Sequence, residues 1–258
     1  MRRFGYAFWV AAALAAFTVG AADSPKIDPA IAAAVASKDR PAADREKDAS
    51  RKPAVVLEFF GVRPGQTLVE YMGGTGNTAE LLARAVGPKG KVYLQNPPQM
   101  LTDPKRLAEL DARLVNNRLP NVERLDKPFD ALGLPQSSID GAVMNLVFHD
   151  MVWITGNVPA VLKDLYATLK PGGFVGVVDH AAPAGTKDEY AKDRKGQHRI
   201  DEEYTKQLFK DAGFVLEGES DALRNPEDDR TKPFFAPEWK DSARFTDRFA
   251  LKFRKPKK

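Results

Sequence analysis

Three histidines and two aspartates of this chain occupy positions where they could act together chemically. His149 and Asp150 follow one predicted strand. Asp179 and His180 come at the end of the next, and His198 precedes the last predicted helix. Because parallel strands end at one edge of a sheet, we expect these side chains to converge there. An imidazole titrates at about pH 6.5, so His149 could take a proton from a reacting hydroxyl or amine while Asp150 orients it. We predict His149, Asp150 and His180 as catalytic residues.

Two other interpretations of the same cluster stay open. His149, Asp150, Asp179 and His180 could bind a divalent ion, which lowers the pKa of a bound hydroxyl and orients it. Alternatively, the side chains only hydrogen-bond loop backbone and cap strand ends. The sequence does not decide among the three, and we assign no metal ligand from it.

A second segment suited to chemistry joins a strand to a helix. The strand Thr67–Tyr71 runs into Met72-Gly73-Gly74-Thr75-Gly76. Glycines allow positive φ and let a nucleotide-like cofactor lie against the main chain, beside the N-terminus of the next helix. Glu70 lies at the carboxyl end of the strand, where open α/β sheets bind their ligands. The residues that we predict to bind the cofactor are Glu70, Gly73, Gly74, Gly76 and Asn96.

This segment fits a dinucleotide cofactor, and it also fits a second cofactor class, which a family resemblance described below implies. Residues 74–79 match the dinucleotide fingerprint G-x-G-x-x-G/A, which on its own is weak evidence. The next strand normally ends in an acid that binds ribose hydroxyls, and here that place holds Asn96, whose amide still accepts and donates hydrogen bonds. A nicotinamide-dependent oxidoreductase is a third functional option, which the missing acid at Asn96 and the two strands that finish the chain without a helix between them weaken.

The elements that must position these residues alternate between strand and helix, which predicts a parallel sheet covered by helices. One helix should be capped by Asn77 or Thr78 and stopped by Gly87-Pro88, another should be capped by Asn157, and the last by Asp201. Two strands then finish the chain without a helix between them. The predicted strands are Thr67–Tyr71, Lys91–Gln95, Val122–Leu125, Ile139–Leu146, Phe174–Asp179, Phe214–Ser220 and Phe245–Phe253.

Residues 70–76 resemble motif I of class I S-adenosylmethionine (SAM) methyltransferases, although Met72 stands where that motif usually has glycine. The run Leu169-Lys170-Pro171-Gly172-Gly173-Phe174 resembles the turn before the fifth strand of the same family. The resemblance covers roughly residues 55–255. It implies an α/β fold, a seven-stranded Rossmann-like class I methyltransferase sheet with a C-terminal antiparallel β-hairpin, and it implies SAM as the cofactor.

Composition and the N-terminus suggest an exported protein. Residues 1–21 have the pattern of a signal peptide, with Arg2 and Arg3 before an apolar run and Val19-Gly20-Ala21 as the cleavage site. We expect a helical lead-in over residues 22–53 with one or two surface helices, and a methyltransferase-like domain over 54–258. The chain has no cysteine, which excludes disulfides and thiolate metal sites. The export signal and residues 40–53, 145–150 and 223–230 also resemble a bacterial group of exported predicted methyltransferases.

These observations lead to two main functional hypotheses. The first is a SAM-dependent methyltransferase acting on a small-molecule oxygen or nitrogen in the cell envelope, in the periplasm. The alternative is a periplasmic methyltransferase-like protein without catalysis that binds a small molecule or metal through the His/Asp cluster.

Basic and acidic side chains nearly balance, which argues against a nucleic-acid partner, and we expect no membrane span after signal cleavage. Phe234, Phe235 and Trp239 either cover an acceptor pocket or pack their loop onto the sheet, and we favour packing.

Overall fold

The described residues, 26–192, 194–239 and 245–257 of this computed structural model, include seven strands in one mixed sheet. The sheet has the order β3-β2-β1-β4-β5-β7-β6. Strands β1 to β5 are parallel, and β7 runs antiparallel to both β5 and β6. The predicted seven-stranded α/β sheet with its C-terminal hairpin is therefore confirmed. The strands are β1 (Thr67–Tyr71), β2 (Lys91–Gln95), β3 (Val122–Leu125), β4 (Ile139–Asn145), β5 (Leu169–His180), β6 (Val215–Ser220) and β7 (Arg248–Arg254).

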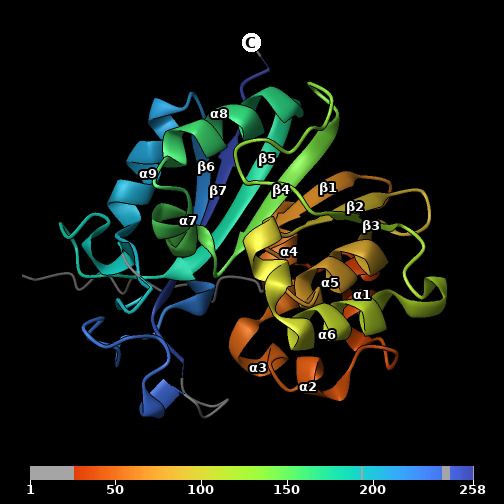
Figure 1. Cartoon of the computed structure of the whole chain (residues 1–258), viewed down its shortest axis with the longest axis horizontal. Coiled ribbons are helices and arrows are strands. Elements are labelled where there is room, and N and C mark those ends of the chain that lie inside the picture. Colours follow the sequence, from red (N-terminus) through yellow and green to blue (C-terminus); the bar gives the residue numbers. More distant parts are fainter. Residues whose placement is uncertain (1–25, 193, 240–244, 258) are drawn as a thin grey trace, which may run out of the picture.

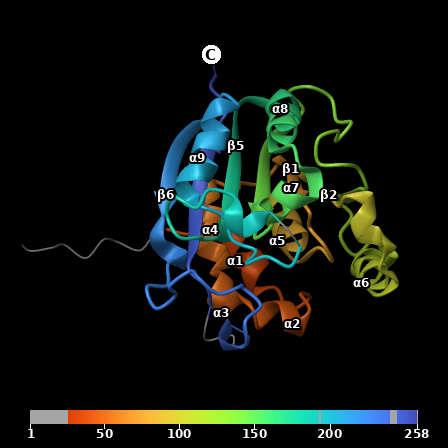
Figure 2. The ribbon, with the colours of Figure 1, turned by 60° about the vertical axis from the view of Figure 1, so that its left-hand side comes forward.

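Helices cover both faces of the sheet (Figures 1 and 2). Buried side chains of α1, α4 and α5 form one apolar core with the sheet, and those of α7, α8 and α9 form another on the opposite face. Successive residues of a strand point to opposite faces, so Leu68 enters the first core and Val69 the second. The helices are α1 (Pro29–Ala36), α2 (Ala42–Arg45), α3 (Asp48–Arg51), α4 (Pro53–Phe60), α5 (Asn77–Val86), α6 (Pro104–Leu114), α7 (Phe148–Thr155), α8 (Val158–Thr168) and α9 (Glu202–Asp211).

The predicted helix caps agree with the structure in two places and differ in one. Asn157 accepts a hydrogen bond from the Ala160 amide, and Asp201 accepts one from the Glu203 amide. The expected Asn77 or Thr78 cap of α5 is wrong, because Gly76 occupies the cap position with φ +85° and no side chain bonds there. Within residues 26–192, 194–239 and 245–257, no helix has the length and apolar character to cross a membrane. The predicted signal peptide lies outside the described residues.

The N-terminal lead-in contributes to the core and to the carboxyl edge of the sheet. Ile31 of α1 is buried in the same core as α5, so the expectation of purely surface helices is wrong. Helices α2 and α3 lie beside the segment that joins β6 to β7 (Figures 1 and 2). The Lys52 ammonium donates to the Ala222 carbonyl at 2.7 Å, and the Arg248 guanidinium donates to the Ser50 carbonyl at 3.0 Å.

A nearly fully buried carboxylate, Glu80 of α5, fixes the helices around the glycine loop. It accepts hydrogen bonds from Arg84 at 2.9 Å, from Arg113 at 2.6 Å and from Arg118 at 2.5 Å. Burial alone would raise the pKa of Glu80, but the three guanidiniums outweigh it and hold that pKa below its usual value. The network therefore depends on a negative charge at this position.

We predict that Glu80→Gln lowers the free energy of unfolding by about 3 kcal/mol, because removing one partner leaves buried guanidinium charge uncompensated. Urea denaturation measures the loss. Glu123→Gln is the matched control, since Glu123 pairs with Lys91 at an exposed site and should cost less than about 1 kcal/mol. Equal losses in the two variants would contradict the assignment of Glu80 as the centre of the network.

Candidate functional site

A cavity of about 680 Å³ lies at the carboxyl ends of the central strands. Its walls come from α2–α3, the glycine loop, the β4–α7 turn, the end of β5, the loop before α9 and the β6–β7 segment. This is the edge at which open α/β sheets bind ligands. The lining includes Arg51, Glu70, Met72, Gly73, Thr75, Asn77, Thr78, Asn145, Leu146, His149, Asp150, His180, His198, Phe234, Phe235, Trp239, Thr246 and Arg248.

The glycine loop forms one wall and has no room for side chains at two positions. A Cβ at Gly73 would come within 2.5 Å of the Glu70 carboxylate. A Cβ at Gly76, where φ is +85°, would come within 2.7 Å of Leu94 and 2.9 Å of Arg113. Gly74 has φ +58° and nothing within 4 Å of the place of its Cβ, so that position needs glycine for its conformation.

Asn96 supports the loop and does not line the cavity. Its side chain is fully buried, accepts from the Gly74 amide at 2.9 Å and donates to the Gly74 carbonyl at 3.0 Å. Gln95, which sequence reasoning missed, accepts from the Met72 amide at 2.9 Å. Both amide side chains therefore shape the loop from behind, and direct contact of Asn96 with a cofactor stays a prediction.

Glu70 lines the cavity and has one carboxylate oxygen that the described residues leave without a hydrogen bond. It is 4% exposed, and its Oε2 atom is buried without a hydrogen bond among the described residues. Burial raises the pKa of Glu70 to about 7, against the opposing effects of Thr78, Ala79, Arg113 and Arg51. A buried oxygen of this kind fits a positively charged group.

Three residues that line the cavity hold a left-handed backbone without being glycine. They are Met72 with φ +50°, Leu146 with φ +61° and His198 with φ +53°. Each such conformation costs about 1 kcal/mol or more, and such strain is commonly found at functional sites. The backbone at Met72 thus keeps the conformation for which glycine is suited, although the side chain has changed.

The predicted convergence of the histidines is confirmed, and His149 is at its centre. Its Nδ1 lies 2.6 Å from Asp179 Oδ1. Asp179 is fully buried and also accepts from the backbone amides of His149 at 2.7 Å and His180 at 2.8 Å. Burial would lower the pKa of His149, but the negative charges of Asp179 and Asp150 outweigh it and raise that pKa. His149 Nε2 is buried without a partner among the described residues.

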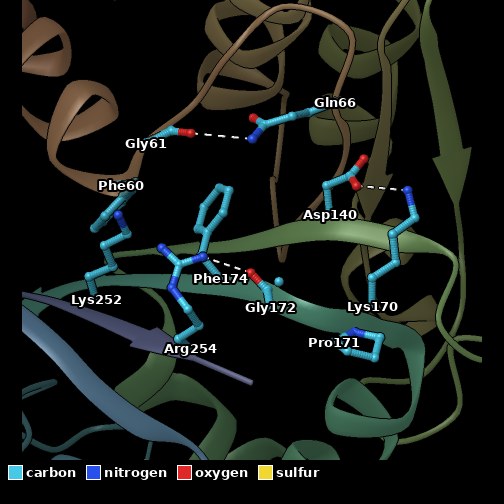
Figure 3. A pocket seen from close by; sticks show the side chains of 11 residues that line it. Phe60, Gly61, Gln66, Asp140, Lys170, Pro171, Gly172, Phe174, Lys252 and Arg254 are labelled. Atoms are coloured by element: carbon cyan, nitrogen blue, oxygen red, sulfur yellow. Dashed lines mark hydrogen bonds and ion pairs between the residues drawn. The ribbon is translucent and has the colours of Figure 1, made fainter. Parts of the chain in front are cut away.

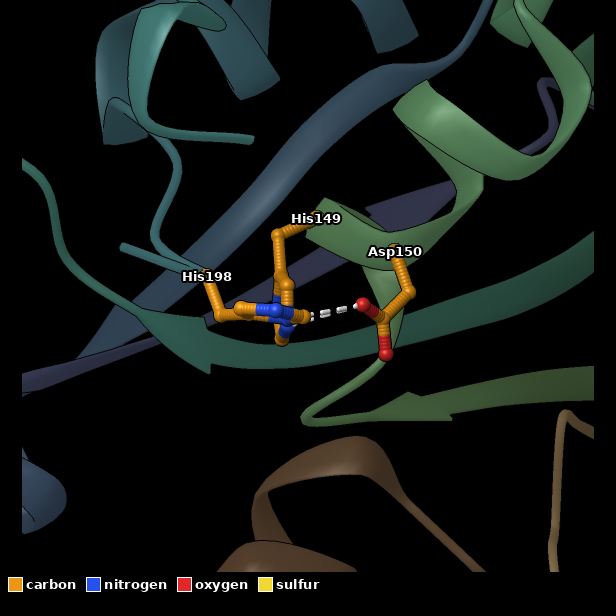
Figure 4. Close-up of side chains that lie close together, drawn as sticks. All are labelled: His149, Asp150 and His198. Carbon is orange, nitrogen blue, oxygen red and sulfur yellow. Dashed lines mark hydrogen bonds and ion pairs between the residues drawn. The ribbon is translucent and has the colours of Figure 1, made fainter. Parts of the chain in front are cut away.

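His198 joins this cluster through Asp150, as Figure 4 shows. His198 Nδ1 lies 3.0 Å from Asp150 Oδ1, and His149 Nε2 lies 3.4 Å from the same oxygen. Trp153 donates to that oxygen at 2.9 Å, so Asp150 is fixed in place. The carboxylate of Asp150 raises the pKa of His198.

His180 lies beside this cluster but has other partners, Thr246 and Phe234. Its Nδ1 is 2.6 Å from the Thr246 hydroxyl, and its ring stacks on Phe234 with centroids 4.9 Å apart. Burial and then the nearby charges of Arg248 and His149 lower the pKa of His180 well below its usual value. The catalytic roles of His149, Asp150 and His180 stay predictions.

A roof segment, residues 224–239, closes the cavity opposite the sheet. Phe234, Phe235 and Trp239 line the cavity, and Phe234 also stacks on His180 at the end of β5, so lining the cavity and packing onto the sheet occur together at Phe234. The roof is anchored by Arg199, a fully buried side chain that donates to Asp228 at 2.8 and 3.1 Å and to the Ala181 carbonyl at 3.0 Å. The sequence marks Arg199 only as a charged residue before a helix.

A second cavity, of about 240 Å³, lies near the amino end of β4 and the start of β5 (Figure 3). Its charged side chains are already paired. Lys170 contacts Asp140 at 2.7 Å, and Lys252 contacts Glu217 at 3.0 Å. Arg254 donates to the Gly172 carbonyl at 2.6 Å. These charged side chains stabilise the fold by pairing with one another. The candidate catalytic and cofactor-binding residues lie at the opposite edge of the sheet.

Comparison with known proteins agrees with this location of the site. A family model described as "Methyltransferase domain" matches residues 42–219, which include the glycine loop and His149. The ubiquinone/menaquinone biosynthesis C-methyltransferase UbiE of Escherichia coli (strain K12 / DH10B) is 28% identical over 127 residues. That match covers 49% of this chain and 47% of UbiE, so the chain spans about half the length of the curated relatives it matches.

Solved structures show the same fold. A SAM-dependent methyltransferase from Aquifex aeolicus is 19% identical, with a TM-score of 0.57 over 84% of this chain and 94% of that one. The [4+2]-cyclase SpnF is 20% identical, with a TM-score of 0.58 over 83% of this chain and 81% of that one. The family match, the sheet order and the glycine loop together show that the chain belongs to the class I SAM-dependent methyltransferases, in the methyltransferase domain family.

Proposed function

We propose that this protein transfers the methyl group of SAM to a small-molecule acceptor bound under the roof segment. The observation that carries the proposal is the unpartnered Glu70 oxygen, which lies against Gly73 at the end of β1. SAM carries a sulfonium and an ammonium group, and a buried carboxylate with one unpartnered oxygen favours a positively charged ligand. The family to which the chain belongs supports the same cofactor.

The residues present fit the cofactor. Gly73 lines the cavity, Gly73 and Gly76 let the loop pack closely on Glu70, Leu94 and Arg113, and Glu70 supplies the negative charge. When bound, SAM supplies an activated methyl group. The Asn96 side chain bonds both the amide and the carbonyl of Gly74, and so it fixes the wall against which the cofactor would lie.

The acceptor end of the cavity is formed by the aromatic roof and the histidine cluster. Phe234 stacks on His180, which gives a flat apolar surface suited to a ring-shaped acceptor. The unpartnered His149 Nε2 and Asp150 face the same space, where an acceptor proton must be removed or its pKa lowered. UbiE is named a C-methyltransferase, and we propose an oxygen or nitrogen acceptor here because the cluster suits activation of a hydroxyl or amine.

A second candidate function is a methyltransferase-like protein that binds a ligand without transferring a methyl group. The position after β2, where an acid normally binds ribose hydroxyls, is filled by Asn96, whose amide is engaged with Gly74. The similarity to a protein titled a [4+2]-cyclase supports this candidate, because the fold alone does not fix the reaction.

We predict that Gly73→Ala weakens SAM binding at least tenfold, because the added methyl group meets the Glu70 carboxylate at 2.5 Å and displaces it. Isothermal titration calorimetry of the full chain with SAM measures the affinity. Gly218→Ala on β6 is the control, since its Cβ meets only Phe59 at 3.3 Å, away from the cavity. Absence of SAM binding to the wild-type chain would refute the proposed function and favour the second candidate.

We predict that SAM binds more tightly at pH 8 than at pH 6, because Glu70, with a pKa of about 7, becomes ionised over this interval. The expected increase in SAM affinity from pH 6 to pH 8 is up to about tenfold. S-adenosylhomocysteine lacks the sulfonium charge but keeps the amino group, so the ratio of the two affinities isolates the effect on sulfur. Glu70→Gln should make that ratio independent of pH. An unchanged ratio in the wild-type chain would refute the role of Glu70.

We also propose export to the periplasm, on the basis of Arg2, Arg3 and the apolar run that follows. Cell fractionation with mass spectrometry should find a periplasmic chain that begins at about residue 22. Replacing Arg2 and Arg3 by Glu should reduce the exported fraction, since the basic residues orient a signal peptide. Recovery of the intact chain in the cytoplasm alone would contradict export.

A further inference from the structure

We propose that His149, Asp150 and His198 form a binding site for one divalent first-row transition metal ion at the acceptor end of the cavity. One ligand atom from each residue lies within 4.8 Å of the other two. His149 Nε2 is buried, has no hydrogen-bond partner among residues 26–192, 194–239 and 245–257, and is directed into this group. Binding of a metal ion at this site is a property separate from methyl transfer, and it can be measured directly.

The hydrogen bonds of His149 fix which of its nitrogens carries a proton. Asp179 accepts hydrogen bonds from two backbone amides, which hold its carboxylate with Oδ1 as an acceptor 2.6 Å from His149 Nδ1. Nδ1 therefore carries the hydrogen, and the lone pair lies on Nε2. A carboxylate behind a histidine that presents its other nitrogen is the usual arrangement at protein metal sites.

His198 shows the same arrangement. Its Nε2 lies 2.9 Å from the Arg194 carbonyl, which can only accept, so Nε2 carries a hydrogen. Its Nδ1 faces Asp150 Oδ1 at 3.0 Å. Both histidines are thus held from behind by an acceptor. Each places its other nitrogen near Asp150, and Figure 4 shows the two rings beside that carboxylate.

The spacing of the three ligand atoms suits a metal ion. Two ligands that each lie about 2.1 Å from a metal are about 3.0 Å apart at a right angle and about 3.4 Å apart at the tetrahedral angle. The Asp150 oxygen lies 3.0 Å from His198 Nδ1 and 3.4 Å from His149 Nε2. The observed separations therefore need little rearrangement.

The donor set points to the class of metal. Two imidazole nitrogens and one carboxylate oxygen suit Zn²⁺, Fe²⁺ or Co²⁺ better than Mg²⁺ or Ca²⁺, which prefer oxygen ligands throughout. Three protein ligands leave coordination positions open toward the cavity. If the proposed function holds, an acceptor hydroxyl at such a position would lose its proton to solvent more readily before its oxygen attacks the methyl carbon.

The test uses the full chain without a histidine tag, treated with EDTA and dialysed. Zn²⁺ titrated by calorimetry should bind with one ion per chain and micromolar or tighter affinity, and elemental analysis should find the same ratio. Co²⁺ should give visible absorption bands typical of nitrogen and oxygen ligation. His198→Gln and Asp150→Asn should each weaken Zn²⁺ binding at least tenfold, and Asp179→Asn about tenfold or more.

His180→Gln is the matched control. The His180 ring lies 5.7 Å from that of His149, but its Nδ1 is bound to Thr246 and it contributes no ligand, so the variant should keep its Zn²⁺ affinity. Thermal melting checks that each variant folds. Absence of Zn²⁺ and Co²⁺ binding by the wild-type chain, or an equal loss in His180→Gln and His198→Gln, would overturn the proposal. SAM binding in the same samples is measured separately, so failure of the metal site and failure of the proposed function remain distinguishable.

Discussion

The guanidinium of Arg113 joins three parts of the molecule beside the glycine loop. It donates to Glu80 of α5 at 2.6 Å, to Asp44 of α2 at 2.6 Å and to the carbonyl of Thr75 in the loop itself. All three groups must stay in place, because a buried charge that loses a partner costs several kcal/mol. The lead-in helices, α5, α6 and the loop therefore behave as one unit, and the cavity wall inherits its shape from this charge network.

The sheet could be predicted closely from the sequence because its strands are short apolar runs bounded by glycine and polar turns. Five of the seven predicted strands begin where the structure begins them or differ by one residue. β5 is longer than predicted because Leu169 already pairs with Ile139, and residues 171–173 lie within the strand, where its pairing with β4 shifts register. The α5 cap was predicted wrongly because Gly76 takes a left-handed conformation that removes the need for a side-chain cap.

The candidate site could be predicted only in part. Topology alone places His149 and His180 at one edge, since His149 follows the parallel strand β4 and His180 ends the parallel strand β5. Which imidazole nitrogen faces the cavity depends on tertiary partners such as Asp179 and Thr246, which no local pattern reveals. The contacts of Asn96 and Arg113 could not be predicted either, because an amide after a strand and a charge on an amphipathic helix usually face solvent. In the structure, Asn96 bonds to Gly74 and Arg113 bonds to Thr75.

The anchor of the roof has a consequence for how the cavity can open. Arg199 binds the roof through Asp228 and the Lys232 carbonyl, and it directly follows His198 in the chain. Phe234 also bonds by its amide to the Gln197 carbonyl, one residue before His198. Any displacement of the roof that admits a bulky molecule therefore pulls on the backbone of His198 and separates it from Asp150. The roof and the His198–Asp150 contact are thereby mechanically coupled, since both depend on the backbone of residues 197–199.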